Sequence, residues 1–182
     1  MNRTRFALLT AMVLAAAASR LLPHAPNFTP IAALAVFGVA TFDDVRAAYV
    51  VPLLGLFASD CALGFYPGMA VVYGSFVLVG SLGYFLRRRR TVARTVAVTL
   101  AGAGAFFAIT NFAVWAQGQL YPQTAAGLLA CYVAAIPFLR NTLSSDLLYS
   151  LLLFGALACA ERWWPALRAP VRRGLATVSL SI

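Results

Sequence analysis

Long apolar stretches separated by short polar breaks constrain this chain more than any other feature of its sequence. A helix needs about 20 mainly apolar residues to cross a hydrocarbon core about 30 Å thick, and several stretches here approach that length. Charged residues make up 10% of the 182 residues, whereas soluble domains carry roughly 25% because their surfaces face water. The sequence therefore predicts an all-α, polytopic membrane helix bundle.

The positions of the polar breaks predict six transmembrane helices. They are residues 6–22, 31–42, 47–65, 69–86, 95–115 and 141–160. The last apolar stretch, 124–160, is too long for one crossing and contains Pro137. It either crosses twice or forms a short outer-side helix over 124–136 before a single crossing. The first stretch follows two arginines as in a signal peptide, but no polar domain comes after it, so we expect an uncleaved helix.

The distribution of arginine decides between these alternatives. Cytoplasmic loops of bacterial membrane proteins collect arginine and lysine, and all 14 basic residues here are arginine. With six crossings and both termini cytoplasmic, only Arg20 and Arg140 fall on the outer side, whereas a seventh crossing would place the C-terminal arginines outside. We therefore expect a multi-pass protein of the bacterial inner membrane. Residues 1–160 form its single transmembrane domain, and 161–182 a basic cytoplasmic tail that contacts anionic lipid.

A net charge of +9 can also indicate nucleic-acid binding. Nucleic-acid-binding proteins interleave basic and polar residues over one face, however, and these arginines lie in the breaks between apolar runs. No nucleic-acid partner is therefore expected.

Polar residues gather on the outer side of this predicted topology, in three separate segments. They belong to the loop 23–30, the far end of the third helix and the start of the sixth. An ionisable side chain within lipid is costly unless it faces protein or water, so it marks a candidate site. The residues predicted to line a substrate-binding pocket are Asn27, Thr29, Asp60, Trp115, Asn141 and Asp146.

Each of these residues also has a purely structural interpretation. Asp60 can pair with Arg140 or Arg20 to neutralise charge at a helix junction. Asp146 lies near a predicted helix start, where the helix dipole favours a carboxylate. Asn27 and Thr29 can cap the second helix.

Cysteine and small residues give two further hypotheses. Cys61, beside Asp60, is a candidate ligand to a metal-containing substrate, although a neighbouring carboxylate disfavours the thiolate. The spacing of Ala7, Ala11 and Ala15 by four along the first helix lets a second helix approach closely, either within the bundle or from another membrane subunit. No resident metal and no cofactor are expected.

Four phrases of the sequence resemble a family of bacterial membrane proteins without an assigned activity. They are Arg20-Leu-Leu-Pro-His-Ala-Pro-Asn-Phe-Thr-Pro30, Ser59-Asp60-Cys-Ala-Leu-Gly-Phe65, Thr110-Asn111-Phe-Ala-Val-Trp115 and Ala135-Ile-Pro-Phe-Leu-Arg-Asn-Thr-Leu143.

The layout also resembles the substrate-binding S component of energy-coupling-factor (ECF) vitamin transporters. That resemblance implies six helices, cytoplasmic termini and a pocket that opens outward. It also implies that the alanines of the first helix, which match an Ala-x-x-x-Ala motif, meet a transmembrane coupling subunit that works with ATPases. Pro137, Phe138 and Asp146 look like the entry to the sixth helix of biotin-type S components, but the linker is longer and no lysine follows, so biotin itself is not implied.

The function expected from these patterns is capture of a small vitamin-like molecule from the outer side and its transport. Energy would come from a separate module, since the chain has no G-x-x-x-x-G-K-[ST] phosphate loop. The alternative is a non-transporting structural or assembly protein of the membrane. An intramembrane enzyme with Asp60 and Asp146 as an acid pair is a third possibility. The sequence lacks a Gly-x-Gly-Asp protease phrase and a His/Glu metal motif, so no enzyme is expected.

Overall fold

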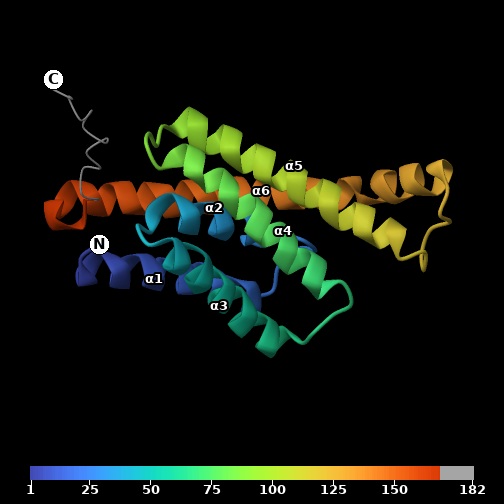
Figure 1. The fold of residues 1–182 in the computed structure, drawn as a ribbon, viewed down its shortest axis with the longest axis horizontal. Helices are drawn as coiled ribbons and strands as arrows, with labels where there is room; N and C mark the ends of the chain where they lie inside the picture. The colour runs from blue at the N-terminus through green and yellow to red at the C-terminus, as the bar shows by residue number, and fades with distance from the viewer. Residues whose placement is uncertain (169–182) are drawn as a thin grey trace, which may run out of the picture.

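The computed structural model describes residues 1–168, and the regular structure within them is entirely helical. The elements are α1 (Arg3–Ala18), η1 (Ser19–Leu21), α2 (Ile31–Thr41), α3 (Val45–Leu63), α4 (Met69–Ser81), η2 (Leu82–Leu86), α5 (Val92–Ala116), α6 (Ala125–Trp163) and η3 (Pro165–Leu167). Figure 1 shows an elongated bundle with α6 along its whole length and α2 in its interior.

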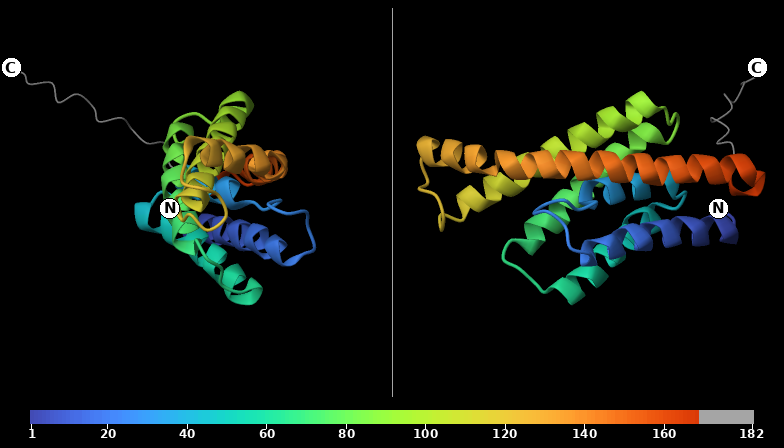
Figure 2. Two further views of the ribbon diagram at one scale, coloured as in Figure 1. Left: turned by 90° about the vertical axis from the view of Figure 1, so that its right-hand side faces the viewer. Right: turned by 180° about the vertical axis from the view of Figure 1, so that it is seen from behind.

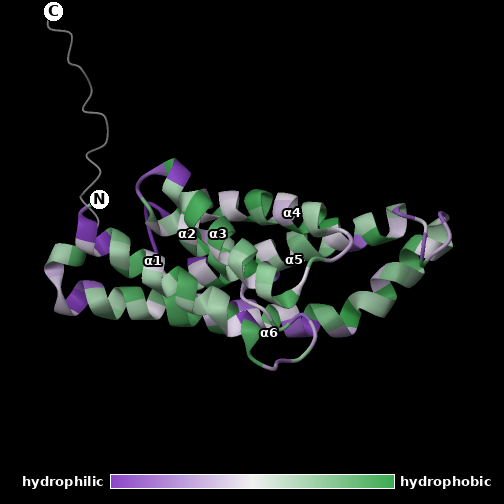
Figure 3. Cartoon of the chain, turned by 90° about the horizontal axis from the view of Figure 1, so that it is seen from below, coloured by the Kyte–Doolittle hydropathy of each residue, from purple (hydrophilic) through white to green (hydrophobic). Residues whose placement is uncertain are grey.

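Five helical segments of the described chain are long and apolar enough to cross a membrane. They are Arg3–Leu21, Val45–Leu63, Met69–Leu86, Val92–Ala116 and Ala125–Trp163. Large apolar side chains such as Leu54, Phe85 and Leu129 are exposed on their outer faces, as expected for surfaces in lipid. Hydrophobic residues cover most of the helix bodies in Figure 3, and hydrophilic ones gather near the N-terminus. The predicted all-helical fold is confirmed for residues 1–168, with five helices that could span a membrane by length and composition. Six crossings and the placement of the termini stay predictions.

The expected second crossing is a short internal helix. α2 has 11 residues, so it is about 16 Å long, roughly half of a hydrocarbon core. Every residue of α2 except Ile31 is buried, and the helix contacts each of the other five α-helices. At Gly83, η2 passes so close to α2 that a Cβ atom would lie 2.9 Å from the Ala40 nitrogen. Small residues on both sides therefore allow α2 to be enclosed by its neighbours.

The predicted outer-side helix over 124–136 is not a separate element. α6 is one continuous helix of 39 residues that includes Pro137. Its first half packs along α5, where the Tyr132 hydroxyl donates to the Ala108 carbonyl at 2.6 Å and the Cys131 thiol contacts the Asn111 carbonyl at 3.4 Å. These contacts support the helix across the proline, which removes only one backbone donor. The α5–α6 hairpin consequently extends beyond the other helices (Figure 2).

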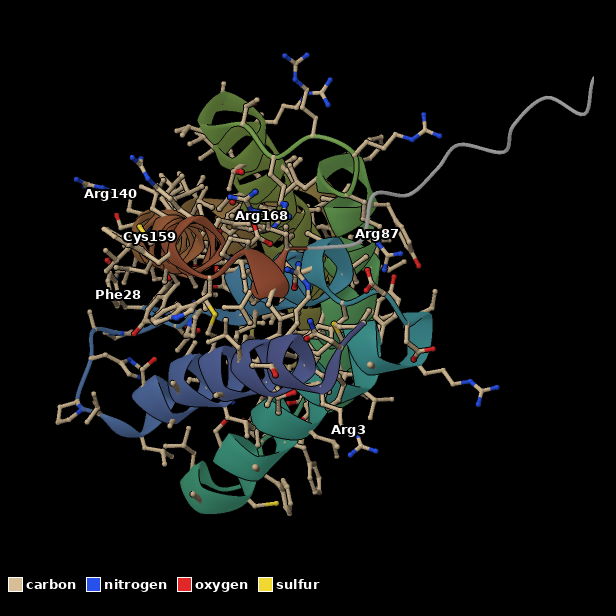
Figure 4. All side chains as sticks on the ribbon, turned by 90° about the vertical axis from the view of Figure 1, so that its left-hand side faces the viewer. Arg3, Phe28, Arg87, Arg140, Cys159 and Arg168 are labelled. Carbon is tan, nitrogen blue, oxygen red and sulfur yellow. The ribbon has the colours of Figure 1, made fainter. Side chains whose placement is uncertain are left out.

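One end of the bundle gathers the N-terminus, the α2–α3 turn, the α4–α5 connection and the end of α6. The N-terminal ammonium lies 3.4 Å from Asp43, and the carboxylate of Glu161 accepts from Arg5 at 2.7 Å and from Arg90 at 3.3 Å. Figure 4 views the molecule from this end, with Arg3, Arg87 and Arg168 labelled. The segments that carry most of the arginines thus share one end, as the predicted topology requires.

The expected basic tail begins inside the last turn of α6, which ends at Trp163. The chain then turns back onto α1, where the Asn2 side chain donates to the Ala166 carbonyl at 2.6 Å and Arg5 donates to the Leu167 carbonyl. The rest of the expected tail, 169–182, lies outside the described residues.

Candidate functional site

A cavity of about 440 Å³ lies beside the middle of α6, where α3 ends and α2 and α4 begin, and away from the end that gathers Arg5 and Arg90. Its polar lining residues are Arg20, His24, Asn27, Thr29, Tyr66, Thr110, Asn111, Thr142 and Asp146. Its apolar ones are Ile31, Ala32, Leu63, Val72, Phe106 and Val114. Small-molecule sites commonly have volumes of about 300–1,000 Å³ and a mainly apolar wall with a few placed polar groups. The cavity therefore has the size and the mixed lining of a small-molecule site.

The loop between η1 and α2 forms one wall of the cavity, and α6 fixes its path. The Asn141 side chain donates to the Pro26 carbonyl and the Ser145 hydroxyl to the Thr29 carbonyl, each at 2.9 Å. Asn27 adopts a left-handed backbone conformation with φ 59°, which asparagine tolerates better than most residues. Phe28 and Arg140 lie on this flank of the bundle in Figure 4. Three proline residues leave this loop few backbone donors, so side chains of α6 satisfy its carbonyls instead.

Asp146 reaches the cavity from the middle of α6 and lies at the N-terminus of α2. Its Oδ1 accepts from the Ala33 amide at 3.0 Å, and the Ala32 amide also faces the carboxylate. The N-cap of α2 is Pro30, which makes no side-chain cap hydrogen bond, so Asp146 caps this helix from α6. The helix dipole that stabilises Asp146 thus belongs to α2 and not, as predicted, to the start of its own helix. The predicted capping by Asn27 or Thr29 is likewise wrong.

The second oxygen of the Asp146 carboxylate, Oδ2, takes no part in this cap. The residue is 1% exposed, and no donor in residues 1–168 reaches Oδ2 with hydrogen-bond geometry. A buried polar atom without a partner is unfavourable and uncommon in folded proteins. Because Asp146 lines the cavity, the missing donor can come from a molecule inside it.

Asp60, by contrast, is fully engaged beside the cavity and does not line it. It is 0% exposed, its Oδ1 accepts from Arg20 Nη2 at 2.6 Å and its Oδ2 accepts from the Tyr73 hydroxyl at 2.8 Å. Arg20 also donates to the Leu56 carbonyl at 3.2 Å and to the Ser59 hydroxyl. Of the two pairings expected for Asp60, the one with Arg20 is formed. It joins η1 to α3 and α4.

Tyr66, in the turn between α3 and α4, adds a hydroxyl to the cavity wall. Burial of the phenol, and then the nearby Asp60 carboxylate, raise the pKa of Tyr66 above its ordinary value. Tyr66 therefore keeps its proton at neutral pH and can donate a hydrogen bond.

The structure brings together only part of the predicted site. Asn27, Thr29 and Asp146 line the cavity, whereas Asp60 and Asn141 lie behind its wall and hold neighbouring segments in place. Trp115 is outside the lining, and its indole donates to the Pro122 carbonyl at 3.0 Å.

The other candidate residues lie on the outside of the bundle. Cys61 is exposed on α3 and does not line the cavity. Ala7, Ala11 and Ala15 are all exposed on α1, so they are free of packing within the described chain. Residues 1–168 contain no group of three or more His, Cys, Asp or Glu side chains placed to hold a metal ion.

Sequence reasoning missed several residues of this region. Tyr73 and Ser145 were not expected there, because hydroxyl groups within apolar helices usually bond to their own helix. Thr142 was expected in this region as a neighbour of Asn141, but not as a lining residue. Thr110 and Asn111 had a recognisable signal, since they are adjacent polar residues inside an apolar run. Asp60 and Asp146, the proposed acid pair, belong to separate hydrogen-bond networks in the described chain.

Comparison with known proteins gives a family and no further relatives. No curated protein and no solved structure matches the chain. The sequence model of one family, described as a family of unknown function (DUF6580), matches residues 1–167. The chain, including all the helices that form the cavity, therefore belongs to the DUF6580 family.

Proposed function

We propose that this chain is an integral membrane substrate-binding protein of the bacterial inner membrane that resembles an S component in its mode of action. It captures a small, vitamin-like molecule from the outer side and passes it inward. The cavity of about 440 Å³, whose wall holds a buried carboxylate oxygen without a donor among residues 1–168, is the observation that carries this proposal.

The position of the cavity supports an outward-facing site. The arginines of four segments lie at the other end of the bundle, and arginine-rich ends face the cytoplasm in bacterial membranes. With both termini cytoplasmic, the loop 22–30 and the α3–α4 turn face outward, so the cavity is reached from outside.

Transport would use energy from a separate membrane coupling subunit with ATPases. The outward-facing row of Ala7, Ala11 and Ala15 supports a docking role for α1, because small exposed side chains let another helix pack closely in lipid.

Filling the cavity tests the binding function directly. Phe106 lines the cavity on α5, while Phe112 of the same helix is 51% exposed and does not line it. The larger indole of Phe106→Trp occupies cavity volume, and Phe112→Trp is the matched control. Small molecules that copurify in mild detergent are identified by mass spectrometry. We expect one compound in the wild type and in Phe112→Trp, depleted at least tenfold in Phe106→Trp. Wild-type protein without a bound compound, or equal amounts in both variants, contradicts the proposal.

The contacts behind the cavity wall favour a second candidate, a non-transporting structural or assembly protein. Asn141, Ser145 and the Arg20–Asp60 pair all join separate segments of the bundle. A structural protein of this kind would carry no ligand, so variants of the cavity residues would change only its stability.

A further inference from the structure

We infer that the cavity binds an organic cation, whose protonated nitrogen donates a hydrogen bond to Asp146 Oδ2. This inference rests on the proposed substrate-binding function and adds the chemical class of the substrate. It is drawn from the charge, burial and unused acceptor oxygen of Asp146 and from the side chains that line the cavity around it.

The first step is the charge balance around the cavity. Arg20 is the one arginine in the wall, and its charge is neutralised by Asp60 at 2.6 Å. Asp146 has no ion-pair partner among the described residues, and its carboxylate lies at the N-terminus of α2. A helix N-terminus is equivalent to about half a positive charge. With Arg20 paired to Asp60, Asp146 is the acidic group that the wall offers to a ligand, and a cation beside it would stabilise the ionised carboxylate.

The second step is the unused acceptor. Oδ1 is occupied by the Ala33 amide, whereas Oδ2 is buried without a donor in the described chain. A nearly inaccessible carboxylate oxygen gains most from a charged donor, because hydrogen bonds between ions are about twice as strong as neutral ones. The N-terminus of α2 would otherwise attract an anion, but Asp146 already occupies that place.

The third step separates an organic cation from a metal ion. A metal ion needs several oxygen, nitrogen or sulfur ligands, and no such group of His, Cys, Asp and Glu exists within residues 1–168. The wall instead combines one carboxylate oxygen that lacks a donor in the described chain with apolar side chains, among them Phe106 and Val114, and with neutral hydrogen-bonding groups such as Asn111. This combination matches a small molecule with one charged nitrogen and an apolar or aromatic body.

Matched pairs of amine and alcohol test the charge requirement. Tryptamine and tryptophol have nearly the same shape, as do pyridoxamine and pyridoxine, but only the first member of each pair carries an ammonium group. Binding to full-length protein in detergent is measured by isothermal titration calorimetry. We expect at least one amine to bind tenfold or more tightly than its alcohol. Equal affinities, or preference for the alcohol, overturn the inference while leaving a binding function in place.

The variant Asp146→Asn tests the residue assignment. Asparagine keeps an oxygen that can accept from the Ala33 amide but removes the charge, so the cap of α2 is retained. We expect the preference for the amine to fall to within twofold. The control Ser144→Ala, at an exposed position two residues away, keeps the preference. Persistence of the tenfold preference in Asp146→Asn overturns the assignment. The wild-type amine and alcohol affinities decide the charge requirement even if this variant does not fold.

If none of the four probes binds, the copurified compound decides. A compound with a protonated nitrogen that is lost from Asp146→Asn supports the inference. A neutral or anionic compound overturns the inference and leaves the proposed binding function in place. Protein that carries no compound and binds no probe overturns the proposed function as well.

Discussion

Two buried carboxylates, Asp60 and Asp146, have nearly the same exposure, 0% and 1%, but differ in their surroundings. Asp60 is paired with Arg20 and receives a second hydrogen bond from Tyr73, so both oxygens are used. Asp146 receives the Ala33 amide on one oxygen and nothing from the described chain on the other. The comparison teaches that burial alone does not identify a functional carboxylate. The saturated carboxylate holds helices together, and the half-satisfied one is free to bind a ligand.

The largest effect is expected for Asp60→Ala, which leaves Arg20 buried without its counter-ion. Loss of one partner of a buried ion pair costs about 3–5 kcal/mol, and Arg20 is only 6% exposed. The free energy of unfolding is measured by SDS titration in mixed micelles with far-UV circular dichroism. In the double variant Arg20→Met/Asp60→Ala most of the loss should return, since no unpaired charge remains. A small effect of Asp60→Ala would mean that the two carboxylates do not differ as described.

The sequence was sufficient to predict the helix bundle and the common end for the arginines. Apolar length and the positions of arginine are properties of the chain itself, so no contact had to be known. The path of 124–160 could not be predicted, because a helix through Pro137 depends on packing against α5. Burial of α2 likewise depends on five neighbouring helices.

The candidate site was predictable only in part, for a related reason. Asp146 was found as a polar residue within an apolar run, and Asn27 and Thr29 as polar residues of the loop 23–30 on the same predicted side of the membrane. The pattern does not show which partner each residue meets. The sequence therefore left Arg140 and Arg20 as alternatives for Asp60 and assigned Asp146 to the start of its own helix, whereas Asp60 pairs with Arg20 and Asp146 lies at the N-terminus of α2.

A smaller effect is expected for Tyr73→Phe, which removes one of the hydrogen bonds to Asp60 and leaves the ion pair. Side-chain hydrogen bonds between membrane helices contribute about 0.6 kcal/mol on average, so the loss in the unfolding free energy should be of that order. Tyr66→Phe, which makes no hydrogen bond to Asp60 in the structure, is the matched control and should be near neutral. A loss of several kcal/mol in Tyr73→Phe would show that Tyr73, and not Arg20, is the main partner of Asp60.

The smallest effect on stability is expected for Asp146→Asn, and it separates the two carboxylates most clearly. The asparagine oxygen can replace Oδ1 as the acceptor for the Ala33 amide, and no cation loses its partner. Asparagine and aspartate are nearly equal as helix caps, so the unfolding free energy should change by less than about 0.5 kcal/mol. Asp146→Ala also loses the cap and should lower the unfolding free energy by about 1 kcal/mol.

The asparagine substitution at the saturated site, Asp60→Asn, leaves the buried Arg20 uncompensated and should be far more costly. The three variants are compared in the same SDS titration, and equal losses in Asp60→Asn and Asp146→Asn would contradict the distinction. If Asp146 binds the ligand, the Asp146→Asn protein stays stable and loses its ligand. If Asp146 is instead a structural residue, the variant loses stability. If the cavity binds no ligand, the variant and the wild type do not differ in ligand content.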